Sequence, residues 1–192
     1  MKITILDGGT TNPGDVSWDA ITAIGDTEIY DNTTKELVVL RGKDADALIM
    51  NRIVMTREIM ESLPKLKYIG TLSTGYNTID LNAAKALGIT VCNVPLYCAP
   101  TVAQQAFALL LELCNHISAH SDAVKENRWD DSIKMSHTTH PIFELHGKTL
   151  GILGYGNIGK TVADLGRALG MNILVYSKNK KNVADGDRFV TL

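Results

Sequence analysis

The sequence has few cysteines, little excess charge of either sign and no long apolar run. Its three cysteines, Cys92, Cys98 and Cys114, form no Cys-x-x-Cys pair, and an odd number of scattered thiols does not suit a disulfide framework. Because no stretch of about 18 apolar residues occurs, a membrane-spanning helix is excluded. The apolar start at residues 3–6 is too short for the core of a signal peptide, so a cytoplasmic protein is expected.

The charge of the chain is nearly balanced, with 19 Lys and Arg residues against 21 Asp and Glu residues and a net charge of −2. Such a weak field does not draw a protein onto nucleic acid or an anionic membrane, so neither partner is expected. Hydrophobic residues make up 45% of the chain, which is ordinary for a globular protein and unlike a disordered one. The 192 residues accommodate one large domain or two small ones.

Short apolar runs alternate with helical patterns in the first half of the chain. This alternation predicts an α/β fold with a parallel sheet covered by helices on both faces. Strands are expected at residues 3–6, 27–30, 47–50, 68–72 and 90–93. Helices are expected at residues 35–41, 56–62 and 80–87, and Gly88 is placed to end the last of them. Residues 1–98 are therefore predicted to form one open-sheet unit.

From Ala99 and Pro100 onward, apolar residues follow helical spacing as far as Ile117. We interpret this segment as a buried connector helix. The three leucines at 109–111 widen its apolar stripe, so a subunit interface is the alternative. A new unit then begins near Leu145, and residues 99–192 are predicted to form a second, incomplete domain.

A strand beginning at Thr149 leads directly into a Gly-x-Gly-x-x-Gly turn, and a helix is expected to follow at residues 157–169. In such a turn the first glycine permits a tight bend, the second lets the backbone approach a pyrophosphate, and the third lets the helix pack closely on the strand. The phosphates would lie at the helix N-terminus, where backbone N–H groups favour anions. The predicted cofactor-binding residues of this turn are Gly154, Tyr155, Gly156, Asn157, Ile158 and Gly159.

The next strand, residues 171–176, is followed by the position that reads the adenosine ribose. NAD-binding folds usually have Asp or Glu there, whereas this chain has Ser177, followed by lysines at 178, 180 and 181. A hydroxyl group with adjacent ammonium groups accepts a 2′-phosphate that a carboxylate would repel. Ser177 and Lys178 therefore favour NADP(H) over NAD(H) as the cofactor, the alternative being that the lysines only form a solvated turn.

Four ordered motifs give the chain a resemblance to the D-isomer-specific 2-hydroxyacid dehydrogenase family, particularly to its glycerate dehydrogenases and hydroxypyruvate reductases. They lie at residues 69–80, 91–95, 99–105 and 145–159. The resemblance implies a flavodoxin-like open-sheet substrate domain followed by the first part of a Rossmann dinucleotide-binding domain. It also implies an oxidoreductase that transfers a hydride between NAD(P)H and a small 2-keto or 2-hydroxy acid such as hydroxypyruvate, glyoxylate or D-glycerate.

The same resemblance assigns roles to individual residues. The main-chain N–H groups of the loop Ser73, Thr74, Gly75 and Tyr76 would hold the carboxylate of the substrate, and we expect Gly75 to permit a bend that turns these donors outward. The alternative is a plain strand-to-helix turn with Asp80 as the helix cap. Thr101 would meet the cofactor near its nicotinamide or phosphate portion.

Proton transfer in the resembled family belongs to a histidine paired with a glutamate, and an arginine binds the substrate; all three are expected beyond Leu192. No catalytic residue is therefore predicted here, and the chain alone is expected to be inactive. The five histidines match no familiar set of metal ligands, so no metal site is predicted. We expect a homodimer for the complete protein. A non-enzymatic remnant that binds a dinucleotide or forms dimers is the alternative to an enzyme.

Overall fold

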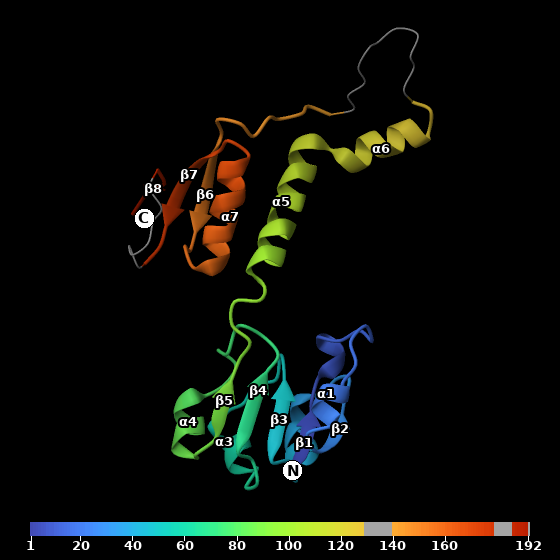
Figure 1. Ribbon diagram of the computed structural model, residues 1–192, viewed down its shortest axis with the longest axis vertical. Helices are drawn as coiled ribbons and strands as arrows, with labels where there is room; N and C mark the ends of the chain where they lie inside the picture. Colours follow the sequence, from blue (N-terminus) through green and yellow to red (C-terminus); the bar gives the residue numbers. More distant parts are fainter. Residues whose placement is uncertain (129–139, 179–185, 192) are drawn as a thin grey trace. The chain divides into compact units, whose positions relative to one another are not determined.

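The computed structural model describes residues 1–128, 140–178 and 186–191 (Figure 1). The chain divides into two compact units, Met1–Tyr97 and Cys98–Leu192. This boundary lies one residue from the predicted one. None of the described helices could span a bilayer.

The first unit is built on a five-stranded parallel sheet in the order β2-β1-β3-β4-β5. This is the strand order of flavodoxin-like folds, so the predicted fold class is confirmed. The strands are β1 (Lys2–Ile5), β2 (Asp26–Ile29), β3 (Ala47–Met50), β4 (Tyr68–Thr71) and β5 (Thr90–Cys92). All five were predicted with ends within one residue of these bounds.

The helices of the first unit are short. They are the 3-10 turn η1 (Gly8–Thr10), α1 (Asp19–Thr22), the 3-10 turn η2 (Lys35–Leu37), α2 (Val38–Gly42), α3 (Arg57–Glu61) and α4 (Leu81–Ala86). Thr56 and Asp80 were predicted to open α3 and α4, and they are the N-caps: their side-chain oxygens accept from the backbone N–H groups of Ile59 and Ala83. Gly88 has a left-handed φ of 71°, which confirms its role after α4. η1 and α1 were not predicted.

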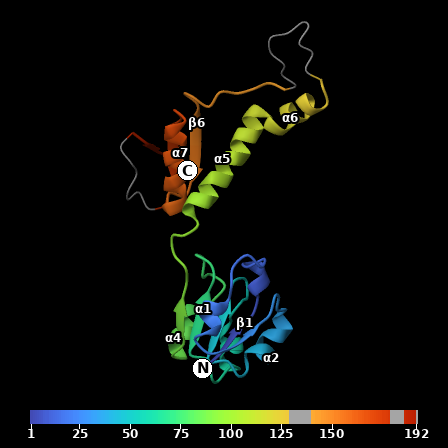
Figure 2. The ribbon, with the colours of Figure 1, turned by 45° about the vertical axis from the view of Figure 1, so that its right-hand side comes forward.

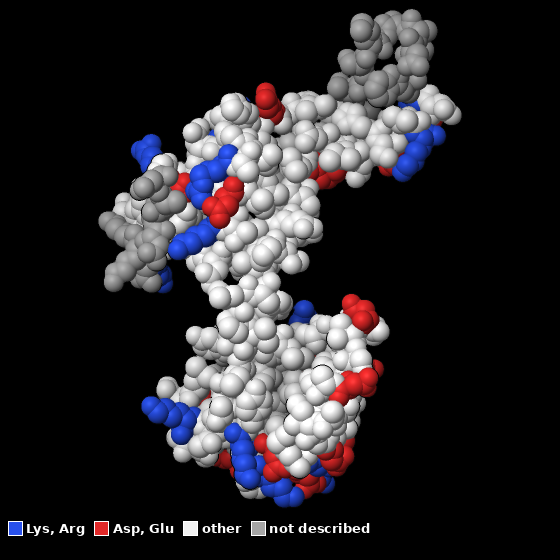
Figure 3. All heavy atoms as spheres, viewed as in Figure 1, with Lys and Arg blue, Asp and Glu red and all other residues white. Residues whose placement is uncertain are grey.

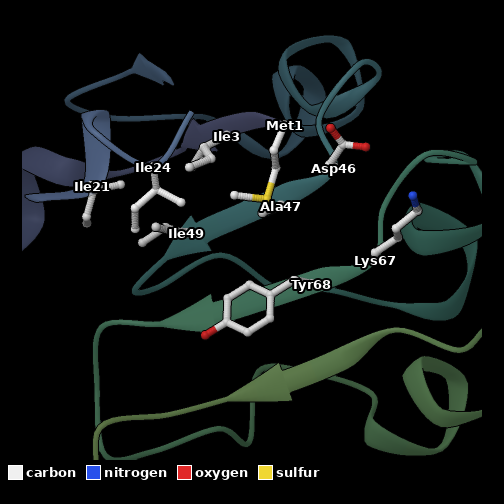
Figure 4. Close-up of a pocket in the computed structure, with 9 residues that line it drawn as sticks. All are labelled: Met1, Ile3, Ile21, Ile24, Asp46, Ala47, Ile49, Lys67 and Tyr68. Atoms are coloured by element: carbon white, nitrogen blue, oxygen red, sulfur yellow. The ribbon is translucent and has the colours of Figure 1, made fainter. Parts of the chain in front are cut away.

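The main core cluster of the first unit lies on one face of its sheet. Strand residues such as Leu48 and Ile69 pack there against Val38 of α2, Met60 of α3 and Ala83 of α4. On the opposite face, Ile3, Ala47, Ile49 and Tyr68 line an apolar hollow of about 690 Å³ together with Ile21 and Ile24, beside α1 (Figure 4). Helices on both faces were expected, but among the described residues the second face is covered unevenly.

The second unit has a three-stranded parallel sheet in the order β6-β7-β8. Its elements are α5 (Ala99–Asn115), α6 (Ile117–Lys125), β6 (Thr149–Leu153), α7 (Asn157–Ala168), β7 (Asn172–Tyr176) and β8 (Arg188–Phe189). α5 and α7 lie side by side in both views (Figures 1 and 2), and Phe107 of α5 packs with Ile152, Ile173 and Val175 of the sheet. The two-residue strand β8 was not predicted.

The connector helix differs from its prediction in two respects. It ends at Asn115, and His116, with a left-handed φ of 49°, separates α5 from α6, so the expected continuous helix through Ile117 is wrong. It is also less buried than expected, because Phe107 and Cys114 lie inside whereas Leu109 and Leu113 are exposed. Pro100 occupies the first turn, where its missing N–H has no intrahelical acceptor to lose.

Candidate functional site

The glycine-rich turn joins β6 to α7 in the second unit, and its geometry explains why glycine occupies these positions. Gly154 has φ +98°, a conformation that other residues rarely adopt. Its N–H donates to the carbonyl oxygen of Tyr176 over 2.8 Å, which fixes the turn to the end of β7. A Cβ at Gly159 would lie 2.1 Å from the carbonyl oxygen of Gly154, so the helix approaches the turn too closely for a side chain.

The space in front of the turn is open. A Cβ built on Gly156 meets no atom within 4 Å, which leaves room for a ligand at the backbone. Gly156 is the N-cap of α7, and no side chain caps the helix there. Among the described residues, none accepts a hydrogen bond from the N–H groups of Asn157 or Ile158, and the first turn of α7 contains no acidic residue. Unpaired N–H groups at the positive end of a twelve-residue helix make a site for an anion.

Tyr155 faces away from this opening. Its side chain is 7% exposed and belongs to the apolar core of the second unit. Its hydroxyl donates to Oδ2 of Asp187 over 2.5 Å. Burial, and then this hydrogen bond, raise the pKa of Tyr155. Only the backbone of Tyr155 is available to a ligand, whereas its side chain has a structural partner that the sequence did not reveal.

The predicted ribose-reading position lies next to the turn. Because Leu153 pairs with Tyr176 across the sheet, Ser177 follows β7 at the level where Gly154 follows β6. Ser177 is half-buried and Lys178 is exposed. Lys180 and Lys181 lie outside the described residues. Thr101 is exposed in the first turn of α5, where no described contact places it against the turn.

The loop after β4 is shaped by side chains. The hydroxyl oxygens of Thr71 and Ser73 are 2.8 Å apart, and the Ser73 hydroxyl donates to the carbonyl oxygen of Gly75 over 2.7 Å. The Thr74 hydroxyl donates to the carbonyl of Val94, and the amide group of Asn93 donates to the carbonyl of Thr74. These bonds attach the loop to the segment that follows β5.

The end of this loop carries backbone donors. Gly75 and Tyr76 are both exposed, and no residue in the described part of the chain accepts a hydrogen bond from their N–H groups. The expectation that the freedom of Gly75 creates the bend is wrong, because Gly75 is not in the left-handed region and a Cβ there would lie 3.4 Å from Oδ1 of Asn77, an ordinary contact. Side-chain hydrogen bonds, rather than a left-handed glycine, therefore shape this loop.

A buried carboxylate that the sequence did not single out supports the neighbouring loop. Asp7 follows β1, is almost fully buried, and accepts from the backbone N–H groups of Asn51 and Arg52, each over 2.7 Å. β3 lies beside β4, and the N–H of Leu72 donates to the carbonyl of Met50. The hydrogen bonds to Asp7 therefore fix the loop after β3, which is adjacent to Ser73. The available signal was an aspartate directly after a buried strand.

Other surfaces offer weaker sites. The hollow of Figure 4 is lined by none of the predicted site residues, and its charged groups, Asp46 and Lys67, lie at its margin. An apolar hollow without convergent polar groups lacks the features that orient a small ligand. Figure 3 shows Lys and Arg mixed with Asp and Glu, with no field of one sign on this face. Among the described residues, no group of three or more His, Cys, Asp or Glu side chains is placed to hold a metal ion.

A parallel strand that ends in a glycine turn at an open helix N-terminus defines a dinucleotide-binding class of α/β protein. The chain belongs to the D-isomer specific 2-hydroxyacid dehydrogenase family, whose catalytic domain matches residues 10–185. The chain is 41% identical to a hydroxypyruvate reductase of Blautia hydrogenotrophica, over 100% of this chain and 61% of the relative. It is 36% identical to a glycerate dehydrogenase of Methylorubrum extorquens, over 77% of this chain and 47% of the relative.

Solved structures give the same result. An acyclic imino acid reductase in complex with NADPH and D-Arg matches 100% of this chain and 60% of its own chain, with a TM-score of 0.79 and 32% identity. A D-lactate dehydrogenase from Aquifex aeolicus, complexed with NAD and lactic acid, matches 99% of this chain and 55% of its own, with a TM-score of 0.78 and 26% identity. The chain thus spans less than two thirds of the length of these relatives.

Proposed function

We propose that this chain serves an oxidoreductase reaction in which a hydride moves between NAD(P)H and a small 2-keto or 2-hydroxy acid such as hydroxypyruvate, glyoxylate or D-glycerate. The observation that carries the proposal is the open N-terminus of α7 behind the glycine turn. The nicotinamide supplies the hydride when it is bound. The residues of this chain bind and orient; none of them is proposed to transfer the proton.

For the cofactor, the pyrophosphate is assigned to the N–H groups of Gly156, Asn157 and Ile158, which have no competing acceptor among the described residues. Ser177 and Lys178 are assigned to the adenosine ribose, because both follow β7 beside the turn. A hydroxyl and an ammonium group suit a 2′-phosphate, so NADP(H) is proposed as the preferred cofactor. Thr101 is retained as a contact near the nicotinamide or phosphate portion of the cofactor.

For the substrate, the carboxylate is assigned to the loop of Ser73, Thr74, Gly75 and Tyr76. Two exposed backbone donors at its end support this role, because neighbouring N–H groups bind an anion without a charged side chain. Residues 1–98 are accordingly proposed as the substrate domain and residues 99–192 as the dinucleotide-binding domain.

The location and assembly of the protein are also proposals. None of Cys92, Cys98 and Cys114 is in a disulfide, which supports a cytoplasmic location. The exposed leucines of α5, Leu109 and Leu113, support a homodimer in the complete protein. No partner other than a small acid, the cofactor and a second copy is proposed.

The test is equilibrium binding of NADPH and NADH to the 192-residue chain, followed by nicotinamide fluorescence. We expect NADPH to bind more tightly, and Ser177→Asp to reverse the order by introducing a carboxylate beside the 2′-phosphate. An unchanged ratio in Ser177→Asp would remove Ser177 from cofactor selection. If the folded chain binds neither nucleotide, the proposed function fails. Reduction of hydroxypyruvate by this chain alone is expected to be absent, and turnover would show that our assignment of no catalytic residue is wrong.

A further inference from the structure

One carboxylate of the second unit is buried with a separate donor on each oxygen. Asp187 lies immediately before β8, and its side chain is 1% exposed. The Tyr155 hydroxyl donates to Oδ2 over 2.5 Å, and the Arg167 guanidinium donates to Oδ1 over 2.6 Å. We call these three residues the Tyr155–Asp187–Arg167 cluster.

The cluster joins three parts of the dinucleotide-binding unit that are distant in sequence. Tyr155 lies between the first two glycines of the turn, and Arg167 lies in the last turn of α7. Asp187 begins the segment that returns to the sheet, where Val190 donates to the carbonyl of Val175. One buried charge therefore attaches both the glycine turn and the chain beyond Ser177 to the helix.

Because the Asp187 carboxylate is buried, it needs both of these donors. A buried carboxylate is unfavourable unless each oxygen is hydrogen-bonded, and here the phenol and the guanidinium satisfy both. Arg167 also contacts Asp164, but that carboxylate is 69% exposed, where ion pairs contribute little. The two carboxylates of one arginine thus differ in burial, and only Asp187 reaches the turn.

The turn needs an anchor of this kind. Gly154 and Gly156 flank Tyr155, and glycine gives the backbone wide freedom on both sides. The turn is held by the bond from Gly154 to Tyr176 and by the side chain of Tyr155, the residue between its first two glycines. A ligand that depends on the adjacent N–H groups binds more tightly when their directions are fixed in advance.

We propose that Tyr155, Asp187 and Arg167 are positioning residues that hold the backbone donors of Gly156, Asn157 and Ile158 in the geometry required by the pyrophosphate of a dinucleotide. They act from the interior and do not contact the ligand. The inference rests on the proposed function, because it assigns these donors to a dinucleotide.

The test uses the full chain and ADP-ribose, which carries adenosine and a pyrophosphate but no nicotinamide. Tyr155→Phe removes one hydroxyl and keeps the ring in the core. Asp187→Asn keeps the shape and removes the charge. Asp164→Asn is the matched control, because it removes the exposed partner of the same arginine. By calorimetry we expect the Kd of ADP-ribose to rise about 5-fold in Tyr155→Phe and about 10-fold in Asp187→Asn, and to stay within about 2-fold in the control.

A second ligand and an NMR spectrum distinguish the positioning role from a merely structural one. Adenosine 2′-monophosphate lacks the pyrophosphate, so its Kd is expected to stay within about 2-fold in Tyr155→Phe, whereas general loosening would raise both constants together. In the 15N–1H spectrum without ligand, the signals of Gly156, Asn157 and Ile158 are expected to shift or broaden in Tyr155→Phe, with those of the first unit unchanged.

The outcomes distinguish the two proposals. If the folded wild-type chain does not bind ADP-ribose, the proposed function fails. If it binds, but Tyr155→Phe and Asp187→Asn bind ADP-ribose as tightly as the control does, the proposed function stands and the positioning role is overturned. Should Asp187→Asn not fold, Tyr155→Phe alone decides, because it retains the buried ring.

Discussion

The loop after β4 and the turn after β6 both present backbone N–H groups at the carboxyl end of a parallel strand, yet they are built in opposite ways. Hydroxyl and amide side chains shape the first loop, through Ser73, Thr74 and Asn93. The absence of side chains shapes the second, where Gly154 needs its positive φ and Gly159 its missing Cβ. Exposed backbone N–H groups can thus be presented by a loop that polar side chains shape or by a turn that glycines make possible.

The units that carry these loops also differ in their cores. Among the described residues, fifteen buried side chains form the main cluster of the first unit and seven form that of the second. Correspondingly, five strands pair in the first sheet, and three described strands pair in the second. We expect the first unit to tolerate a polar, individually hydrogen-bonded loop because its larger core supplies stability, whereas the second unit depends more on local fit.

The largest expected effect comes from removing core volume in each unit. Leu48→Ala, at a fully buried position, should lower the free energy of unfolding of the first unit by about 3 kcal/mol, whereas Ile173→Ala should cost the second about 2 kcal/mol because a small core collapses more readily around a cavity. Urea unfolding followed by hydrogen exchange in each unit measures both. Equal losses in the two units would contradict the comparison.

The next largest effect is expected from a substitution at Gly159, where α7 approaches the glycine turn closely. Gly159→Ala forces a Cβ against the carbonyl of Gly154, so we expect a loss of about 2 kcal/mol in the second unit together with loss of dinucleotide binding. Gly156→Ala is the matched control, since it has open space and should leave the stability within about 0.5 kcal/mol. Thermal unfolding and ligand titration provide the measurement. A stable Gly159→Ala variant would show that the turn can open.

A smaller effect on the free energy of unfolding is expected from removing the buried carboxylate of Asp7. Asp7→Ala leaves the N–H groups of Asn51 and Arg52 without their acceptor, and we expect a loss of about 1.5 kcal/mol. The exposed Asp15→Ala serves as the control and should change stability by less than about 0.5 kcal/mol. Chemical denaturation of the three proteins decides the point; similar midpoints in all three would mean that water replaces the carboxylate.

The smallest effect is expected at Gly75. Because its φ is not left-handed and a Cβ would make only an ordinary contact, Gly75→Ala should change the free energy of unfolding by less than about 0.5 kcal/mol. Gly154→Ala, at φ +98°, should be clearly more destabilising. A pair of thermal melts compares the two. If both variants lose equal stability, glycine freedom shapes both loops.

The sequence predicted the features that depend on local pattern. Apolar runs located all five strands of the first sheet, and the glycine spacing located the turn together with the reasons for Gly154 and Gly159. Short elements were missed, because the four residues of α1 and the two of β8 are too few to show a period.

Features that depend on distant contacts could not be predicted. The partner of Tyr155 lies 32 residues further along the chain, so its buried hydrogen bond gave no signal in the motif. Asp7 likewise binds residues of another strand's end, 44 and 45 positions away. The prediction for Gly75 was wrong because the presence of a glycine in the sequence does not reveal its φ.

The strand order also determines how long individual amide protons resist exchange with deuterium. In the first sheet β1, β3 and β4 each have a neighbour on both sides, whereas among the described strands of the second sheet only β7 does. Backbone amides of internal strands exchange only when the surrounding unit opens. The latest-exchanging amides should therefore form a broad band in β1, β3 and β4 but a single line along β7, so that β7 alone reports the opening of the unit that carries the glycine turn.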